Sequence, residues 1–341
     1  RWVDHDRRDA RYSVPQRPPR TLRTPKTTST TSTQSRGESV SANVRDMRPS
    51  ATIAVSSLAK RLASEGRDIL NLSAGEPDFD TPAFIADAAI EGIRSGRTRY
   101  TPAPGLPELR RAIAASLSER AGRELPWEGI VVSAGAKQSL FNACFSLFGP
   151  GDEVLIGAPY WTSYPEMIGL SRATAVPVAG AEARDFRLTP DDLEAATTDR
   201  TRGFLFSSPG NPTGVGYSVG ELRDIAEWAR DRGIWLLADE IYRRIWFGEG
   251  DEAPSVLDLD PASLGDHVLI DGASKAFAMT GWRIGCSLSS PELAKTMSGF
   301  QSHTTSNAST PSQMAALAAW TETDRTAAAV AERREAFRRR R

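Results

Sequence analysis

Six short runs of mainly apolar residues recur along the middle of the chain, with segments of helical spacing between several of them. The runs are Ile130–Val132, Glu153–Ile156, Thr174–Val178, Gly203–Phe206, Ile234–Ala238 and Val268–Ile270. Short, uniformly apolar runs are typical of strands buried on both faces, and the intervening helices can supply the cover. The pattern therefore predicts an α/β protein with a mainly parallel central sheet and helices on both faces.

Helical spacing and end signals predict several helices. One begins at about Pro82, with Thr81 as its N-cap, and ends near Gly96. The others span about 106–121, 138–147 and most of 309–341. Upstream of them, the apolar run Ile69–Leu72 is expected to form a first strand that leads into a turn-rich stretch.

The N-terminal part has a different composition from the rest of the chain. It is rich in Arg, Pro, Thr and Ser, and it includes the low-complexity run Thr27–Thr33. Such a segment cannot bury enough apolar surface to offset its ordering entropy, so residues 1–40 are expected to form a disordered leader. Aspartates near its beginning argue against an organelle transit peptide. We hypothesise that the natural start lies at Val40 or Met47.

Composition narrows the class of protein. Of the 341 residues 25% are charged and 40% are hydrophobic, which is ordinary for a globular protein. A net charge of −1 gives no sign of a nucleic-acid or membrane partner. The cysteines, Cys144 and Cys286, lie in apolar runs and are expected to fill core space, and no cluster of metal ligands is evident. We expect a soluble, cytoplasmic enzyme without a metal.

Candidate chemistry concentrates in the stretch Asp271–Gly285. The apolar run before it ends at Gly272, and Lys275 follows among small residues. A lysine in such surroundings is partly desolvated, which lowers the pKa of its amine and allows it to form a Schiff base with an aldehyde. A lone lysine of this kind is more often a solvated loop residue. The prediction therefore depends on motifs elsewhere in the chain.

Those motifs carry a resemblance to a known family. Ser274–Lys275 together with Gly281–Gly285 resembles the cofactor-lysine segment of class I, fold type I, pyridoxal phosphate-dependent aminotransferases. Asn211–Gly214, Asp239–Tyr242 and Gly75–Phe79 occur in the family's order and support the resemblance. Within the family the sequence is most similar to the bacterial aspartate aminotransferase branch.

The resemblance covers about residues 41–341 and implies a domain plan. Residues 41–80 would form the N-terminal arm and the start of a small domain, and 81–308 the large cofactor-binding domain. Residues 309–341 would form a long helix leading to a C-terminal small domain that is absent from this sequence. The family also implies a homodimer with composite sites.

The resemblance assigns the chemistry to a few residues. Lys275 would be the catalytic residue, holding pyridoxal phosphate as a Schiff base and then moving a proton at the substrate's α-carbon. Asp239 follows an apolar strand, where sheets of this class place their ligands, and would pair with the protonated pyridine nitrogen. Tyr242 and Asn211 would contact the phenolic oxygen. Glu240, which follows Asp239, is expected to be structural.

Further residues are implied for the cofactor's phosphate and ring. Gly135 and Ala136 lie at a strand-to-helix turn, where free backbone N–H groups favour an anion. Arg283 would add a fixed positive charge with bidentate geometry. Trp161 would stack on the ring, although a tryptophan is more often part of the core. Tyr100 would reach the phosphate held by the neighbouring subunit.

The substrate would contact a partly overlapping set. Lys137 resembles a lysine that binds an acidic side chain in the bacterial branch, although an exposed lysine at the start of a helix is the plain alternative. Gly75 would offer its backbone to the substrate carboxylate, and Asn211 and Trp161 would also line the substrate site. The segment 49–52 matches one that closes over the site.

We therefore expect an aminotransferase that moves the amino group of an acidic, aspartate-like amino acid to 2-oxoglutarate. Its partners would be small amino acids and 2-oxo acids. The same motifs admit aromatic, prephenate-like or neutral substrates, and other pyridoxal phosphate chemistry such as β-elimination. A further alternative is an inactive truncated chain or a cofactor-binding pseudoenzyme. In the family, an arginine of the C-terminal domain binds the substrate carboxylate, and the arginines at 338–341 come too early to replace it.

Overall fold

The computed structural model describes residues 41, 44, 47, 51–72 and 75–341 of the chain. The predicted leader, residues 1–40, lies outside the described residues, as do Pro49 and Ser50 of the proposed closing segment. All elements described below belong to one compact unit that begins at residue 42.

A seven-stranded sheet runs through the described part of the chain in the order β1-β7-β6-β5-β4-β2-β3. The strands are β1 (Ile130–Ser133), β2 (Glu153–Ala158), β3 (Thr174–Ala179), β4 (Thr201–Ser207), β5 (Trp235–Asp239), β6 (His267–Gly272) and β7 (Gly285–Leu288). Only β7 runs against its neighbours, β1 and β6, and the other pairs are parallel. The predicted α/β class and mainly parallel sheet are confirmed.

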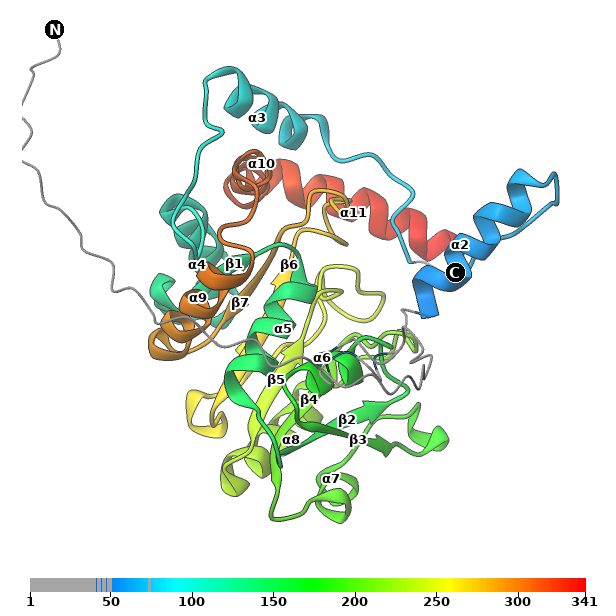
Figure 1. The fold of residues 1–341 in the computed structure, drawn as a ribbon, viewed down its shortest axis with the longest axis vertical. Coiled ribbons are helices and arrows are strands. Elements are labelled where there is room, and N and C mark those ends of the chain that lie inside the picture. The colour runs from blue at the N-terminus through cyan, green and yellow to red at the C-terminus, as the bar shows by residue number, and fades with distance from the viewer. Residues whose placement is uncertain (1–40, 42–43, 45–46, 48–50, 73–74) are drawn as a thin grey trace, which may run out of the picture. The chain divides into compact units, whose positions relative to one another are not determined.

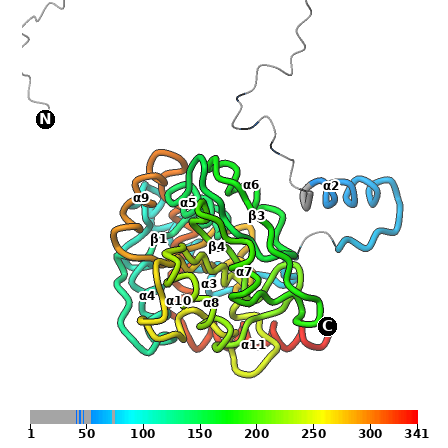
Figure 2. The backbone as a smooth tube through the Cα atoms, turned by 90° about the horizontal axis from the view of Figure 1, so that it is seen from below, coloured from blue at the N-terminus to red at the C-terminus, as the bar shows by residue number. Residues whose placement is uncertain are grey.

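Helices cover both faces of this sheet (Figures 1 and 2). One face packs against α5 (Ala136–Leu147), α6 (Tyr164–Leu170) and α9 (Pro291–Thr304). The other packs against α3 (Ala83–Arg94), α4 (Pro107–Ala121), α7 (Pro190–Ala196), α8 (Val219–Arg232) and α10 (Thr310–Thr321). Along β6, Leu269 enters one core while Val268 and Ile270 enter the other. This alternation explains why the strands are apolar throughout.

Two local predictions at the N-terminal side are wrong. The run Ile69–Leu72 forms no strand, and the side chains of Leu70 and Leu72 are 89% and 96% exposed. The edges of the described sheet are β1 and β3, and this run pairs with neither of them. Thr81 does not cap α3, whose N-cap is Pro82. Instead, the Thr81 hydroxyl donates to the carbonyl of Ala278 at 2.7 Å, a distant tertiary contact.

The expected long helix over 309–341 is divided into two helices. It consists of α10 and α11 (Thr323–Arg340), with Glu322 in a non-helical conformation between them. The indole of Trp320 is buried edge-on against the ring of Phe277, 5.1 Å between centroids. Across the break, the hydroxyl of Thr326 donates to the carbonyl of Ala319 at 2.9 Å. These contacts hold α10 in the core and fix the point where the helix is interrupted.

Candidate active site

Three neighbouring strands bring the main candidate residues together. β4, β5 and β6 are adjacent and parallel, so their carboxyl ends meet at one edge of the sheet. Asn211 follows β4, Asp239 ends β5, and Lys275 follows β6. In open α/β sheets this edge is where ligands bind. The sequence order of the motifs thus becomes one spatial cluster.

Asp239 lies at the buried end of the cluster. Its side chain is 3% exposed and its Oδ2 accepts a 2.7 Å hydrogen bond from the Oη of Tyr164, the first residue of α6. The backbone N–H of Ile241 donates to Oδ1 at 3.3 Å. Burial raises the pKa of Asp239 to about 6, although these two hydrogen bonds oppose the increase. At neutral pH the carboxylate is ionised and well placed to bind a cationic N–H.

Sequence reasoning missed Tyr164. Its contact with Asp239 joins residues 75 positions apart, and no spacing rule points to it. The phenol is buried, and burial raises its pKa well above the usual value, so Tyr164 remains a donor to the carboxylate. The one sequence signal was local: Tyr164 follows three residues after Trp161, and their rings meet edge-on at 5.6 Å.

Tyr242 and Asn211 meet beside Lys275. The amide Nδ2 of Asn211 donates to the Oη of Tyr242 over 3.4 Å, and the Lys275 Nζ lies 5.7 Å from the centre of the Tyr242 ring. Burial raises the pKa of Tyr242 to about 12, so its phenol stays protonated. Both side chains can therefore donate to an oxygen placed between them.

Lys275 contacts a segment from the other end of the chain. Its Nζ donates a 2.6 Å hydrogen bond to the carbonyl oxygen of Gly75. Burial lowers the pKa of Lys275 and the Arg283 charge acts in the same direction, while the carboxylates of Glu76 and Asp239 oppose it. A lowered amine pKa raises the fraction of neutral, nucleophilic lysine at a given pH.

A cationic corner lies at the N-terminus of α5. Gly135 is the N-cap with φ +88°, and a Cβ there would overlap the guanidinium of Arg283. The same guanidinium donates to the carbonyls of Thr280 and Ala134, at 3.0 and 3.3 Å. A Cβ on Gly285 would overlap the backbone N of Ala136. These two glycines thus allow Arg283 and the first N–H groups of α5 to lie close together. A guanidinium beside free backbone N–H groups is suited to bind a phosphate.

Lys137 and Trp161 lie next to this corner. The Nζ of Lys137 is 4.8 Å from the centre of the Trp161 ring. Burial lowers the pKa of Lys137, and the charge of Arg283 adds to the decrease. Trp161 therefore contacts two of these side chains: the ammonium of Lys137 lies over its ring, and the ring of Tyr164 packs against it at nearly a right angle.

Two predicted residues stand apart in the described structure. Tyr100 is 92% exposed and does not join the cluster. Glu240 is fully buried, and its carboxylate accepts from the hydroxyl of Ser255 at 2.6 Å and from the backbone N–H of Val256 at 2.9 Å. Burial raises its pKa to about 7. The expectation that Glu240 is structural agrees with these contacts.

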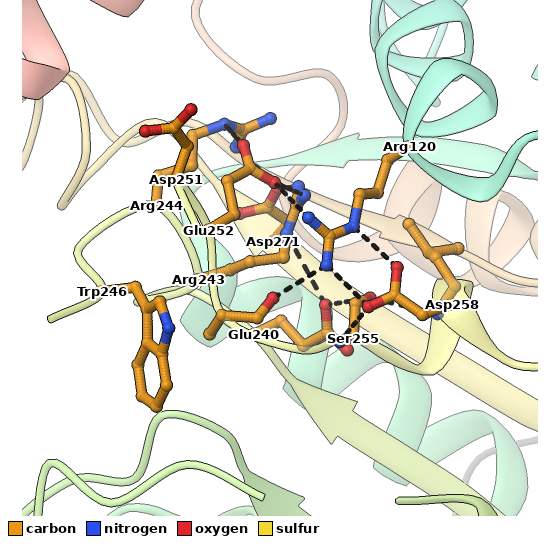
Figure 3. A network of polar contacts seen from close by, with 12 residues as sticks. Arg120, Glu240, Arg243, Arg244, Trp246, Asp251, Glu252, Ser255, Asp258 and Asp271 are labelled. Carbon is orange, nitrogen blue, oxygen red and sulfur yellow. Dashed lines mark hydrogen bonds and ion pairs between the residues drawn. The ribbon is translucent and has the colours of Figure 1, made fainter. Parts of the chain in front are cut away.

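A network of ion pairs next to the cluster was also not anticipated (Figure 3). Arg243, 1% exposed, and Arg244 both contact Oδ2 of Asp271, at 3.0 and 2.9 Å, and both pair with Glu252. Burial acts to raise the pKa of Asp271, but the guanidiniums of Arg244 and Arg243 outweigh it, so that pKa is lowered. The network ties the turn after β5 to the end of β6.

The donor set fits pyridoxal phosphate. A buried carboxylate suits a ring N–H, two neutral donors suit a phenolate, and an amine of lowered pKa suits an aldehyde. An arginine and a helix N-terminus suit a phosphate. Among the described residues no group of His, Cys, Asp and Glu could hold a metal ion. None of the described helices is long and apolar enough to cross a membrane.

Comparison with known proteins gives a consistent result. Residues 67–341 match the family model described as aminotransferase class I and II. A probable aspartate/prephenate aminotransferase of Rhizobium leguminosarum is 44% identical over 80% of this chain and 68% of the relative. An aspartate aminotransferase of Streptomyces avermitilis is 43% identical over 89% and 73%. The structure of Thermus thermophilus aspartate aminotransferase with maleate superposes with a TM-score of 0.83 at 38% identity, covering 88% of this chain and 78% of that one.

Proposed function

The chain belongs to the class I and II aminotransferases, and on that premise we propose that it transfers the amino group of aspartate to 2-oxoglutarate. Members of this family depend on pyridoxal phosphate, which when bound supplies an electron sink for the carbanion at the substrate's α-carbon. The observation that carries the proposal is the convergence of Lys275, Asp239 and the Tyr242–Asn211 pair after three adjacent parallel strands.

Cofactor binding would be divided among residues already in contact with one another. Asp239, ionised at neutral pH and oriented by Tyr164, would accept a hydrogen bond from the protonated ring nitrogen, which keeps its proton. Tyr242 and Asn211 would donate to the phenolic oxygen. Gly135, Ala136 and Arg283 would bind the phosphate, and Trp161 would cover a face of the ring.

Lys275 would act on both cofactor and substrate. Its amine would bind the cofactor's aldehyde. Once the substrate has released it, the amine would accept the proton from the substrate's α-carbon and return it to the carbon of the cofactor's former aldehyde. Its lowered pKa favours the neutral form that this role requires. The backbone of Gly75, which already contacts Lys275, would receive the substrate's carboxylate.

Lys137 supports an acidic substrate. It is a cation beside Trp161, at the start of α5 and close to the cofactor-binding residues. A second carboxylate on the substrate would form a charge-assisted hydrogen bond with it. The relative from Rhizobium leguminosarum is named for prephenate as well as aspartate, so prephenate, itself a 2-oxo acid, is a second candidate acceptor.

A transamination assay tests the proposal. The full chain, loaded with pyridoxal phosphate, is given aspartate and 2-oxoglutarate, and oxaloacetate is measured, with Lys275→Ala as the control. Oxaloacetate formation that depends on Lys275 would support the function. If aspartate is inert while an aromatic or neutral amino acid is converted, the substrate assignment is wrong. If every amino acid is inert, the proposed activity is wrong.

We also propose a homodimer in which Tyr100 serves the partner's site. Its 92% exposure leaves the phenol accessible to a second copy. Mixing Lys275→Ala and Tyr100→Ala chains tests this, because a hybrid dimer contains one site with an intact lysine and an intact tyrosine. Activity above that of the Tyr100→Ala chain alone would support a shared site. An unchanged activity in exchanging dimers would contradict it.

A further inference from the structure

One face of α11 lies against the segment 78–80. Arg333, Phe337 and Arg340 are spaced by four and three residues, so they lie on the same side of the helix. The Phe337 ring meets that of Phe79 edge-on at 5.4 Å. The Nη1 of Arg340 lies 2.8 Å from both carboxylate oxygens of Asp78.

Arg333 makes the innermost of these contacts. It is only 8% exposed, and its Nη2 donates to the carbonyl of Asp80 at 2.8 Å while its Nη1 donates to the carbonyl of Ala276 at 3.4 Å. The bridge therefore joins the 78–80 segment to the residue after Lys275. By contrast, Arg339 is exposed and pairs with Glu335 of its own helix at 3.7 Å. Burial of one arginine on a highly charged helix indicates a specific role for it.

The same segment contacts the Lys275 loop along its length. The Gly75 carbonyl accepts from Lys275 Nζ, and the carboxylate of Glu76 accepts from the hydroxyl of Thr280. At the far end, the hydroxyl of Thr81 donates to the carbonyl of Ala278 and accepts from the indole N–H of Trp282, at 2.7 and 2.9 Å. Residues 75–80 form no helix or strand of their own, so these side-chain contacts fix their path.

We propose that Arg333 is a positioning residue for the active site: with Phe337 and Arg340 it holds segment 75–80 so that the Gly75 backbone lies against Lys275. This role rests on the proposed function, in which the Gly75 backbone meets the substrate's carboxylate. Arg333 itself touches neither cofactor nor substrate and acts through the two loops it joins. The bridge thus couples α11 to the backbone of Gly75, where the substrate's carboxylate would bind.

The first test is structural and needs no activity. A protease that cuts before large apolar residues is applied to the full, cofactor-free chain, and cleavage before Phe79 is followed by mass spectrometry. Arg333→Met should speed this cleavage about tenfold, because the protease acts on the locally opened segment. Arg339→Met is the matched control, with the same chemical change on the same helix, and should cleave at the wild-type rate.

The second test separates positioning from general stability. In the loaded enzyme, Arg333→Met should raise KM for aspartate about tenfold with kcat changed less than about threefold, since a contact common to ground and transition states affects KM alone. A merely structural residue would instead lower the melting temperature and the active fraction, leaving KM unchanged.

The outcomes are distinct. Faster cleavage at Phe79 with a raised KM supports the positioning role, and wild-type behaviour in both tests overturns it. If Arg333→Met does not fold, Arg340→Ala replaces it, because the Arg340 side chain is exposed. Arg340→Ala should show the same two changes at a smaller size. If it shows neither change, the proposal is overturned. If the wild-type chain converts no amino acid, the proposed function fails, while cleavage at Phe79 still decides whether α11 holds the segment.

Discussion

The Oη of Tyr164 donates a 2.7 Å hydrogen bond to Oδ2 of Asp239, at the buried carboxyl end of β5. Two effects therefore act on this carboxylate in opposite directions. Burial favours its neutral form, and the hydrogen bond favours its charged form. The balance decides over which pH range Asp239 can bind a protonated ring nitrogen.

Removing the hydroxyl of Tyr164 should shift that range. The wild-type chain is expected to lose affinity for pyridoxal phosphate as the pH falls below about 6, where Asp239 becomes protonated. Tyr164→Phe removes a bond to the charged form, so the pKa of Asp239 rises and the loss begins about one pH unit higher. The measurement is the dissociation constant of the cofactor against pH. Superimposable wild-type and variant profiles would show that Tyr164 does not tune Asp239.

Asp239 should also make the cofactor-free protein less stable above its folded pKa. That pKa is about 6 in the folded chain, against an ordinary value of about 3.9, so the folded state binds the proton more tightly. Stability is therefore lost as the pH rises through the window between these values, by about 3 kcal/mol in full.

Asp239→Asn is accordingly expected to stabilise the cofactor-free chain. The gain in the free energy of unfolding, measured with urea, should be about 2–3 kcal/mol near pH 8 and should vanish near pH 4. Asp231→Asn, at an exposed position, provides the control and should change little at either pH. A gain that does not depend on pH would have a different origin from the Asp239 charge.

Gly135→Ala should disrupt the phosphate corner. The new Cβ would sit at φ +88° and overlap the guanidinium of Arg283, which must then move. Gly122→Ala is a matched control, because Gly122 also has positive φ, at +62°, with open space around it. Gly122→Ala should lose about 1 kcal/mol of stability from backbone strain, because Gly122 is left-handed. Gly135→Ala should lose more, up to about 3 kcal/mol, because ψ of 158° places Gly135 in a region that is essentially restricted to glycine. Only Gly135→Ala should lower affinity for pyridoxal phosphate, and equal affinities in the two variants would contradict the assignment.

Lys137→Met should change the choice of substrate. If Lys137 binds a second carboxylate, kcat/KM for aspartate should fall about tenfold or more, the typical size of a lost hydrogen bond to a charged group. The value for alanine should change little, since alanine has no second carboxylate. A parallel loss for both amino acids would place Lys137 on the cofactor instead.

The sheet could be predicted because its strands are buried on both faces. Five of the six apolar runs, from Ile130–Val132 to Val268–Ile270, lie entirely within an observed strand. The sixth, Ile234–Ala238, begins one residue before β5. β7 escaped prediction, since Gly285–Leu288 holds small residues that fit between two neighbours and form no apolar run. Ile69–Leu72 shows the reverse error, an apolar run without a partner strand.

The motif residues lie close together, as the resemblance implied. The residues that hold them in place could not be predicted from the sequence. Tyr164, Arg243 and Arg333 act through contacts with residues far away in the chain. Burial of a tyrosine or an arginine is set by tertiary packing, which no local pattern encodes. Thr81 lies where the sequence pattern predicts an N-cap, yet α3 begins one residue later and the Thr81 hydroxyl donates to the distant carbonyl of Ala278. Local propensity was overridden where the loops of the site meet.

The most direct test of the central claim is the visible absorbance of the purified chain with pyridoxal phosphate, before and after aspartate is added. We predict a band of lysine-bound cofactor that is absent in Lys275→Ala and that aspartate bleaches. A band that survives in Lys275→Ala, or no band in the wild-type chain, would contradict the assignment of Lys275 as the residue on which the site is built.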